Sequence, residues 1–340
     1  MESSSDAVSD AAPSITLCMI VRNEARDLPR CLASVAGLVS EVIVVDTGST
    51  DDTPAIAEAH GAILRRHGWG DDFAEARNVA LAHATGDWIL HLDADEELEA
   101  PSRPRLETQL RESPADGLRL RVRSLLPQQD PQRYEDDWIV RLFRRRAGLR
   151  YQGRLHEQIR PAIERLGGRV LDADLTILHH GYAQPTAQGT DRRHRNLALL
   201  DRMLAAAPED PYLHYHRGLT LHALGQHAAA ASALRQALAL GAAELGDGVR
   251  IRLYRRLAQL ALAAEEYPAA LQHAAAGLAR QPDDLLCLWV AALARMFQGD
   301  VAEAQPLFQR VRRSPTLQPA WTRDLDAVLA ACEHALSKSR

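Results

Sequence analysis

The sequence predicts an α/β domain followed by an all-α domain built from helical repeats. Over residues 14–185, short apolar runs alternate with helix-like stretches, which is the pattern of an α/β domain. Over residues 186–338, strand signals disappear, alanine and leucine dominate, and small residues recur at fixed intervals. The chain has 340 residues, of which 46% are hydrophobic and 25% are charged, so its length and composition suit two globular domains.

The α/β region contains three near-continuous apolar runs, which indicate strands buried on both faces of a mostly parallel sheet. These runs are Ile15–Val21, Val42–Asp46 and Trp88–Asp93. The stretches between them have helical character over Leu28–Leu38, Pro54–His60 and Phe73–Ala84. Proline at position 54 suits a first helical turn, and the hydroxyl and carboxylate side chains before it supply N-caps.

The all-α region shows a repeat when Gly218, Ala258 and Ala292 are aligned as equivalent positions. The positions that then also align are Gly225, Glu265 and Gly299, followed by Ala230, Ala270 and Ala304. The second interval is 34 residues, and segment 241–248 accommodates the longer first interval of 40 residues. Small residues at fixed places let paired helices pack closely. This spacing resembles the tetratricopeptide repeat, with Tyr267 and Pro282 in their expected places. We expect the helix Asp191–Ala206 to bridge the two domains.

Composition limits the location and the partners that we expect. Residues 1–13 are rich in Ser, Asp and Ala and predict a disordered tail, with neither the basic nor the apolar segment of a signal peptide. The net charge of -5 is too small to indicate nucleic acid or an anionic membrane surface as a partner. The 4 cysteines are widely spaced, which favours free thiols over a disulfide framework or a zinc site. No apolar run approaches the ~20 residues of a membrane span, so we expect a cytoplasmic protein.

Carboxylates stand at the ends of two predicted strands, where open α/β sheets bind ligands. Asp46 ends one strand and is followed by a turn through Gly48 and Ser49. The segment Asp93-Ala94-Asp95 ends another strand, and two carboxylates two residues apart on an extended segment can share one Mg²⁺ or Mn²⁺. The alternatives are a capped strand-to-helix turn after Asp46, and solvated acids that open a helix after the second strand.

Further polar side chains are expected at the same edge of the sheet. Asn23 and Glu24 follow the first strand, where the alternative for Asn23 is a helix cap. Asp72, Arg77 and Asn78 precede the paired acids by one helix. A guanidinium group suits the oxygens of a diphosphate, and the alternatives for Arg77 are an arginine on the helix surface or a salt bridge to Asp72 that braces the loop.

The chain resembles family 2 glycosyltransferases of the GT-A fold, a Rossmann-like nucleotide-sugar-binding domain, in the segments MIVRNEARDLPRCL, VIVVDTGSTDDT, WGDDFAEARNVAL and GDWILHLDADEEL. The similarity covers about residues 14–182 and is greatest to the branch with lipopolysaccharide-core glucosyltransferases and SunS-type peptide S-glycosyltransferases. Members of the SunS type also carry tetratricopeptide-like helices. The resemblance implies a UDP-sugar donor, Mg²⁺ or Mn²⁺, and inversion of the anomeric carbon. It implies donor contacts from Val21, Asn23, Glu24, Asp46, Gly48, Ser49, Asp72, Arg77, Asn78, Asp93 and Ala94. One departure is Thr47, where many members carry a second acid that contacts the nucleobase.

The resemblance extends to the segments Trp138–Arg144, Gly153–Glu157 and His179–Tyr182, but the family pattern QxxRW is not present, so the resemblance does not identify the acceptor side. Glu157 is the first candidate for the base that takes the acceptor proton, and Asp136 or Asp137 are the alternatives, because acids before an Arg-rich segment often hold this role in the family. His179 or His180 can complete the metal shell, and the alternative for each is a structural hydrogen bond. The predicted metal ligands are Asp93, Asp95 and His179.

The predicted reaction needs a metal that neutralises the leaving diphosphate and a base that deprotonates a saccharide, peptide or protein acceptor. The arginines in segment 141–146 predict either contact with an anionic acceptor or a solvated basic strand. The helical repeats either recruit the acceptor or only cap the catalytic domain. The main alternative function is a non-catalytic repeat scaffold with a degenerate nucleotide-binding domain. A nucleotidyltransferase is less favoured, because VRNEARD stands where such enzymes have a Gly-rich basic loop.

Overall fold

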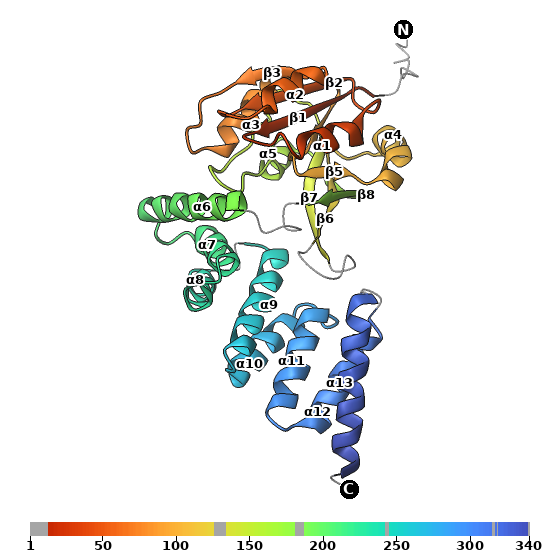
Figure 1. Ribbon diagram of the computed structural model, residues 1–340, viewed down its shortest axis with the longest axis vertical. Helices are drawn as coiled ribbons and strands as arrows, with labels where there is room; N and C mark the ends of the chain where they lie inside the picture. Colours follow the sequence, from red (N-terminus) through yellow and green to blue (C-terminus); the bar gives the residue numbers. More distant parts are fainter. Residues whose placement is uncertain are drawn as a thin grey trace, which may run out of the picture. The chain divides into compact units, whose positions relative to one another are not determined.

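Figure 1 shows the computed structural model, which describes residues 13–125, 134–180, 187–241, 245–314, 317 and 319–338. The chain divides into two compact units between residues 185 and 186. The first unit contains a sheet with helices, and the described part of the second unit contains helices and no strand. The predicted tail lies outside the described residues, except for residue 13. Among the helices that the structure describes, none is both long and apolar enough to cross a bilayer.

The first unit is organised around one mixed sheet, which has eight strands in the described part of the chain. In spatial order they are β3 (Ile63–Arg66), β2 (Glu41–Asp46), β1 (Ile15–Val21), β4 (Trp88–His91), β7 (Tyr134–Arg144), β6 (Gly117–Leu125), β8 (Val170–His179) and β5 (Glu96–Leu98). Strands β1 to β4 run parallel, whereas β7 is antiparallel to both β4 and β6. The parallel half therefore brings the carboxyl ends of β1, β2 and β4 to one edge, where sheets of this kind bind ligands.

The predicted α/β fold is confirmed, with differences at the ends of single elements. Strand β1 spans the predicted range, but β4 ends at His91, because the residues from Asp93 onward form a turn in which the Glu96 N–H donates to the Asp93 carbonyl over 3.0 Å. The residues after that turn form β5, which pairs with β8. The alternative of a helix opening at this point is therefore wrong.

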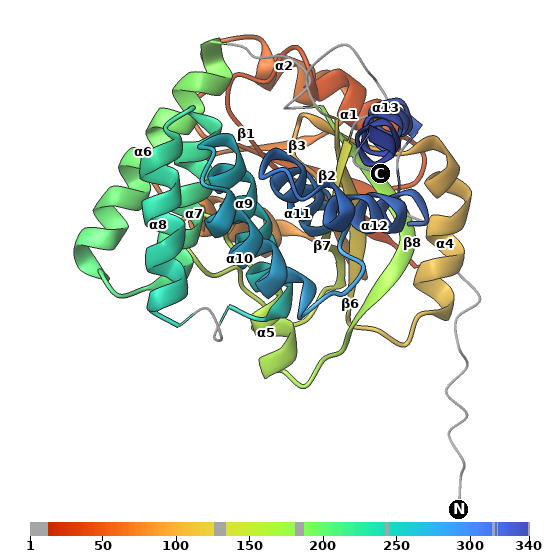
Figure 2. The same cartoon turned by 90° about the horizontal axis from the view of Figure 1, so that it is seen from below.

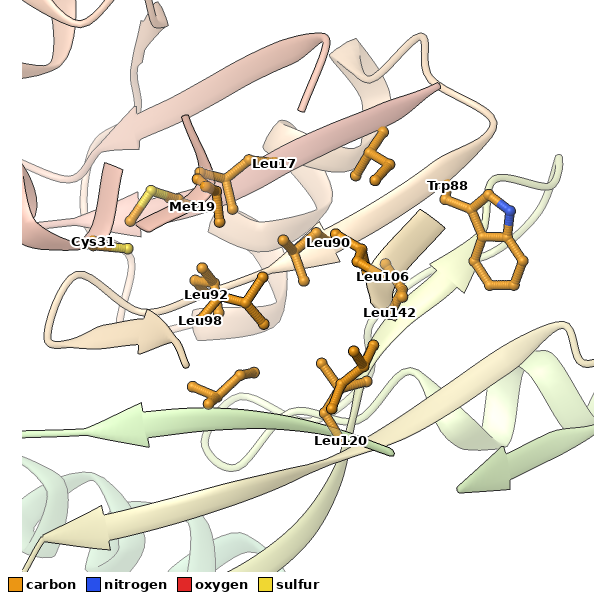
Figure 3. Close-up of a cluster of buried hydrophobic side chains, with 14 of the residues drawn as sticks. Leu17, Met19, Cys31, Trp88, Leu90, Leu92, Leu98, Leu106, Leu120 and Leu142 are labelled. Atoms are coloured by element: carbon orange, nitrogen blue, oxygen red, sulfur yellow. The ribbon is translucent and has the colours of Figure 1, made fainter. Parts of the chain in front are cut away.

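Helices cover both faces of the sheet. They are α1 (Leu28–Val35), α2 (Thr53–Ala59), α3 (Phe73–His83), the short 3₁₀ helix η1 (Ala100–Ser102), α4 (Arg103–Glu112) and α5 (Arg160–Arg165). One core lies under α1 and α4, and Figure 3 shows Leu17, Leu90 and Leu142 of three strands in it, with Leu106 of α4. The other core lies under α3 and α5 and contains Cys18. Because neighbouring residues of β1 enter opposite cores, this strand is buried on both faces, as predicted.

The second unit is an array of helices that resembles tetratricopeptide repeats. The helices are α6 (Ala187–Ala206), α7 (Pro211–Ala223), α8 (His227–Ala239), α9 (Asp247–Ala263), α10 (Tyr267–Leu278), α11 (Leu285–Phe297), α12 (Val301–Arg312) and α13 (Pro319–Lys338). Helices α7 to α12 form three helix–turn–helix pairs, and α9 to α12 lie side by side in Figure 2. The predicted alignment places Gly218, Ala258 and Ala292 in the first helices of the pairs. It places Ala230, Ala270 and Ala304 in the second helices, where all three are buried.

The small residues of the repeat act at the points of closest approach. A Cβ atom on Gly218 would lie 2.6 Å from side-chain atoms of Leu234, so a larger residue there would force Leu234 of α8 to shift. The turns inside the three pairs place Gly225, Glu265 and Gly299 in the left-handed region, with φ of 76°, 59° and 88°. A left-handed residue ends the first helix of each pair, and glycine adopts this conformation without strain.

Candidate functional site

The loops after β1 and β2 bond to each other at the carboxyl edge of the sheet. The Thr47 N–H donates to the Val21 carbonyl over 3.0 Å, which joins the ends of the two strands. The Ser49 N–H and hydroxyl both donate to Oδ1 of buried Asp46, over 3.0 Å and 2.5 Å. Gly48 has a φ of 106°, which favours glycine. The structure therefore gathers these four predicted donor-site residues in one place.

Asn23 fastens the first loop to the second. Its backbone is left-handed, with φ of 56°, and its Oδ1 accepts the Thr50 N–H over 2.8 Å. The Asn23 N–H donates to the Ser49 hydroxyl over 3.0 Å, and the Glu24 N–H donates to the Thr53 hydroxyl over 2.7 Å. The alternative of a helix cap is wrong, because α1 begins only at Leu28.

Asp93 lies between two buried guanidinium groups. Arg77 Nη2 donates to Asp93 Oδ1 over 2.8 Å, and Arg141 Nη2 donates to Oδ2 over 3.2 Å. Burial opposes the charge of this carboxylate, but Arg77 and Arg141 hold the pKa of Asp93 well below its ordinary value. Burial and the same two arginines lower the pKa of His91 to about 3, so this neighbouring ring is neutral at pH 7. Asp93 is therefore a fixed anion with both oxygens engaged.

Arg77 is carried by α3, whose N-cap is Asp72. The Asp72 carboxylate accepts the Glu75 N–H over 2.9 Å, so it caps the helix rather than pairing with Arg77. Arg77 is 7% exposed and donates from Nε to Glu157 and from Nη2 to Asp93. The predicted alternative of a salt bridge between Arg77 and Asp72 is therefore wrong, and the partners come from other loops.

Glu157 is the second carboxylate that Arg77 binds, beside Asp93. Its side chain is 9% exposed and its Oε1 accepts from Arg77 Nε. The loop that carries it is closed by paired backbone hydrogen bonds between Gln152 and Gln158, at 3.0 Å and 2.8 Å. The structure thus brings the predicted base into an ion pair with buried Arg77.

Asp95 lies beside His179, the last residue of β8. Asp95 Oδ2 is 3.5 Å from His179 Nε2, and His179 Nδ1 is 3.1 Å from the Ser124 hydroxyl. Burial lowers the pKa of His179, but Asp95 raises it above its ordinary value overall. His180 turns instead toward Glu97, with Nε2 and Oε1 3.0 Å apart. Of the two predicted histidines, His179 is the one that faces the paired acids.

The pair formed by Asp95 and His179 fits a divalent cation that also binds a substrate. Within the described residues, no group of three or more His, Cys, Asp or Glu side chains gathers as a complete protein cage. Mg²⁺ and related ions commonly use one or two protein carboxylates and fill the remaining positions with phosphate oxygens and water. An imidazole also suits Mn²⁺ as a ligand. The donor set therefore matches a metal shared between the protein and a diphosphate.

The two neighbouring acids of β7 point to opposite faces of the sheet. Asp136 makes a bidentate ion pair with Arg123 over 2.9 Å and 3.0 Å. Asp137 is opposite Val122 on β6, so the two side chains share a face of the sheet. Ser124, two residues after Val122, is on that face too, and so is His179 of β8, which is opposite Ser124. Asp137 is half-buried. The register therefore separates the two candidates and places Asp137 on the side of His179.

Two other residues that were predicted to contact the donor, Asn78 and Ala94, interact with other parts of the protein. The Asn78 side chain exchanges two hydrogen bonds with the backbone of Tyr151, over 2.8 Å and 3.0 Å, so it fastens α3 to the following loop. Ala94 is buried in the core beneath α1. Their predicted contact with a donor remains a prediction.

Glu96 and Arg141 form a buried ion pair that the sequence did not predict. Glu96 is 2% exposed and Arg141 is 7% exposed, and Arg141 Nη2 donates to Glu96 Oε1 over 2.5 Å. Both alternatives for segment 141–146 are therefore wrong for Arg141, which is neither solvated nor open to an acceptor. A single arginine inside the apolar run WIVRLF is the signal that indicates a buried ion pair.

The comparisons with known proteins cover both units. A family model described as Glycosyl transferase family 2 matches residues 16–161. A TPR repeat-containing protein of Synechococcus elongatus is 40% identical over 275 residues, which cover 77% of this chain and 67% of that protein. The glycosyltransferase SunS of Bacillus phage SPbeta is 28% identical over 228 residues, which cover 66% of this chain and 53% of SunS.

Among solved structures, that of TarS of S. aureus is similar with a TM-score of 0.41 and 14% identity, over 76% of this chain and 54% of TarS. The chain thus spans two thirds of the length of the Synechococcus relative and about half the length of SunS and TarS.

Proposed function

Because the chain belongs to glycosyl transferase family 2 and carries tetratricopeptide-like repeats, we propose that it transfers a sugar from a UDP-sugar to an acceptor, with inversion of the anomeric carbon. The observation that supports this most is the approach of Asp95 and His179, 3.5 Å apart, at the edge of the sheet where Asp46 also lies. A binding scaffold has no need for a carboxylate and an imidazole held together at this edge.

The nucleoside would bind at the loops after β1 and β2. Asp46 is fixed by Ser49, and Asn23 fastens the two loops together, so the surface that meets the base and ribose is preorganised. Thr47 lacks the charge that many family members have at this position, so Asp46 would act alone as the acid. Preformed polar groups at such an edge lower the ordering cost of binding.

The diphosphate would be held by Mg²⁺ or Mn²⁺ at Asp95 and His179. A metal bound there would neutralise the charge that develops on the leaving diphosphate. Asp93 would keep the site negative beside the cation, while Arg77 and Arg141 hold its carboxylate in place.

We assign the base to Asp137 rather than Glu157. An acceptor hydroxyl must lose its proton to a carboxylate within hydrogen-bond reach, and such a carboxylate has to be accessible. Glu157 and Asp137 are both half-buried, so the assignment rests on position: the Glu157 carboxylate pairs with buried Arg77, and Asp137 lies on the sheet face that carries His179. Glu157 would instead orient Arg77.

The acceptor would be a saccharide or a peptide or protein side chain, recruited by the helical unit. That unit has a groove of ≈ 540 Å³ lined mainly by apolar residues of α10, α11 and α12, with Arg295 and Glu303 among them. Apolar walls with a few polar groups are typical of sites that bind peptides and other ligands.

The test is thermal unfolding with UDP and Mn²⁺, followed by initial rates of sugar transfer from UDP-glucose, UDP-N-acetylglucosamine and UDP-galactose. A ligand at ~100 times its dissociation constant stabilises the folded state by about 2.7 kcal/mol, which is several degrees for a chain of this size. The shift should require Mn²⁺ and disappear in Asp95→Ala. If no nucleotide shifts the melting temperature at millimolar ligand and metal, the proposal is wrong and the scaffold alternative is favoured.

Asp137→Asn and Glu157→Gln separate the two candidate bases. Because general-base catalysis contributes roughly 10²–10⁴-fold, Asp137→Asn should lower kcat by about that factor while the binding of UDP with Mn²⁺ is kept. Should Glu157→Gln alone cause this kcat loss at unchanged binding, the assignment of the base would be reversed.

A further inference from the structure

The turn that carries Asp95 is closed by Glu96. The Asp93 N–H donates to Glu96 Oε2 over 2.9 Å, and the Glu96 N–H donates to the Asp93 carbonyl over 3.0 Å. The next strand reinforces the turn, because the His180 N–H donates to the Asp95 carbonyl over 2.9 Å. The position of the Asp95 carboxylate therefore depends on where Glu96 is held.

Glu96 is held by Arg141. One guanidinium nitrogen, Nη2, donates to both Glu96 Oε1 and Asp93 Oδ2, over 2.5 Å and 3.2 Å. Arg141 thus joins both ends of the turn, and its strand β7 pairs directly with β4, which leads into the turn.

A bulge in β7 directs Arg141 to this turn. Leu142 is opposite Leu118 and Val140 is opposite Arg119, so Arg141 is the extra residue between two consecutive residues of β6. Leu142 lies in the core under α1 and α4, and Val140 lies in the core under α3 and α5. Bulges commonly re-aim a side chain beside an active site.

Stability alone does not account for this pair. Replacing a buried ion pair by apolar residues of similar volume is often neutral or stabilising. Within the described residues, Nε of Arg141 is also buried without a hydrogen-bond partner, which is unfavourable for folding. A buried pair with an unsatisfied nitrogen, aimed at one turn by a bulge, is better suited to orienting that turn.

We propose that Arg141 and Glu96 are positioning residues that hold the turn 93–96 so that Asp95 meets His179 at the distance a shared divalent cation requires. This inference rests on the proposed function, because it concerns the same metal and diphosphate. Both side chains are buried, so neither is open to a sugar or an acceptor. They act through Asp95, as outer partners orient the ligands of metal sites.

The experiment measures Mn²⁺ affinity in the presence of UDP by isothermal titration calorimetry, on the full chain without acceptor. The variants are Arg141→Lys, Glu96→Gln and the double apolar replacement Arg141→Met with Glu96→Leu. The matched control is Arg144→Lys on the same strand, since Arg144 donates to the Ser113 and Ala115 carbonyls, over 3.2 Å each, and lies over the Trp88 ring. Unfolding by urea gives the stability of each variant.

We expect Arg141→Lys and the double replacement to weaken Mn²⁺ binding by about 10- to 100-fold, with Arg144→Lys unchanged. Glu96→Gln keeps an acceptor for the Asp93 N–H, so its Mn²⁺ affinity should fall by a smaller factor. A double variant that regains wild-type stability and also wild-type Mn²⁺ affinity would show a purely structural pair and overturn the inference. Should a single variant fail to fold, the double variant decides in the same way.

The proposed function fails by a different result. If the wild-type chain itself binds neither UDP nor Mn²⁺, or if Asp95→Ala binds Mn²⁺ with UDP as the wild type does, the metal site is absent and the positioning role is overturned with it. If the wild type binds and Asp95→Ala does not, while Arg141→Lys and the double variant bind like the wild type, only the positioning inference fails.

Discussion

The edge of the sheet and the helical array are stabilised in opposite ways. At the edge, Asp93, Glu96 and Glu157 are held by Arg77 and Arg141, so charged groups from distant parts of the chain depend on one another. In the array, small residues such as Ala230, Ala270 and Ala304 let neighbouring helices approach, and each contact is local. A charge network is sensitive to the loss of any one member, whereas a repeat array is sensitive mainly to added volume.

The largest effect is expected from Asp95→Asn, which removes a charge from the edge and keeps the size of the side chain. Because a catalytic metal contributes several kcal/mol of charge stabilisation, transfer should fall by roughly 1000-fold. Initial rates measure this effect, and circular dichroism checks that the variant is folded at the assay temperature. Asp172→Asn is the control, since its ion pair with Arg119 lies on the surface. Equal losses in both variants would contradict the assignment.

The next effect concerns Arg77, the guanidinium group that binds both Asp93 and Glu157. Arg77→Met leaves Asp93 and Glu157 without this buried partner, which should lower the free energy of unfolding by about 3–5 kcal/mol. Urea unfolding measures the change. Arg105→Met is a control, because the Arg105–Asp174 pair is exposed and should change stability by about 1 kcal/mol or less. A small change in Arg77→Met would mean that the two carboxylates find other partners.

A smaller effect is expected when volume is added to the array. Gly218→Val places atoms against Leu234, which should lower the free energy of unfolding by roughly 1–3 kcal/mol. Gly248→Ala, in the first turn of α9, meets open space and should stabilise by about 0.5–1 kcal/mol. Both are read by thermal unfolding, and UDP binding with Mn²⁺ should stay at the wild-type level. If Gly218→Val unfolds with the wild-type free energy, α7 and α8 can move apart without a loss of stability, and the prediction is wrong.

The smallest effect tests the turn inside the second repeat pair. Glu265 has a φ of 59° at the position where the other two pairs have glycine. Left-handed backbone costs a residue with a side chain about 1 kcal/mol, so Glu265→Gly should stabilise by about that amount. Gly225→Ala should destabilise by a similar amount at the equivalent turn. Thermal unfolding measures both variants, and the melting temperature should rise in Glu265→Gly and fall in Gly225→Ala.

Much of the fold was predictable because it depends on local patterns. Continuous apolar runs predicted β1, β2 and β4, and the spacing of small residues predicted the helix pairs of the array. The secondary structure of the segment after Asp93 was harder to predict, since acidic residues there suit the start of a helix as well as a strand. Pairing with β8 made it β5, and no local pattern contains that information.

The candidate site was predictable where side chains follow strand ends. Asp46 and Asp95 were identified by position alone, and Asp95 lies beside the predicted His179. The partners of Arg77 were not identified, because Asp93 and Glu157 are 16 and 80 residues away along the chain. A salt bridge between such residues depends on which loops the sheet brings together.

The sequence by itself determined the order of the two units, the strands that are buried on both faces, and the types of residue that can hold a metal and a diphosphate. Apolar periodicity and residue chemistry are local properties, so they can be read without a structure. Only the tertiary structure decided which charges meet. The bulge that directs Arg141 to Glu96, and the register that places Asp137 on the side of His179, arise from strand pairing between residues far apart in the chain.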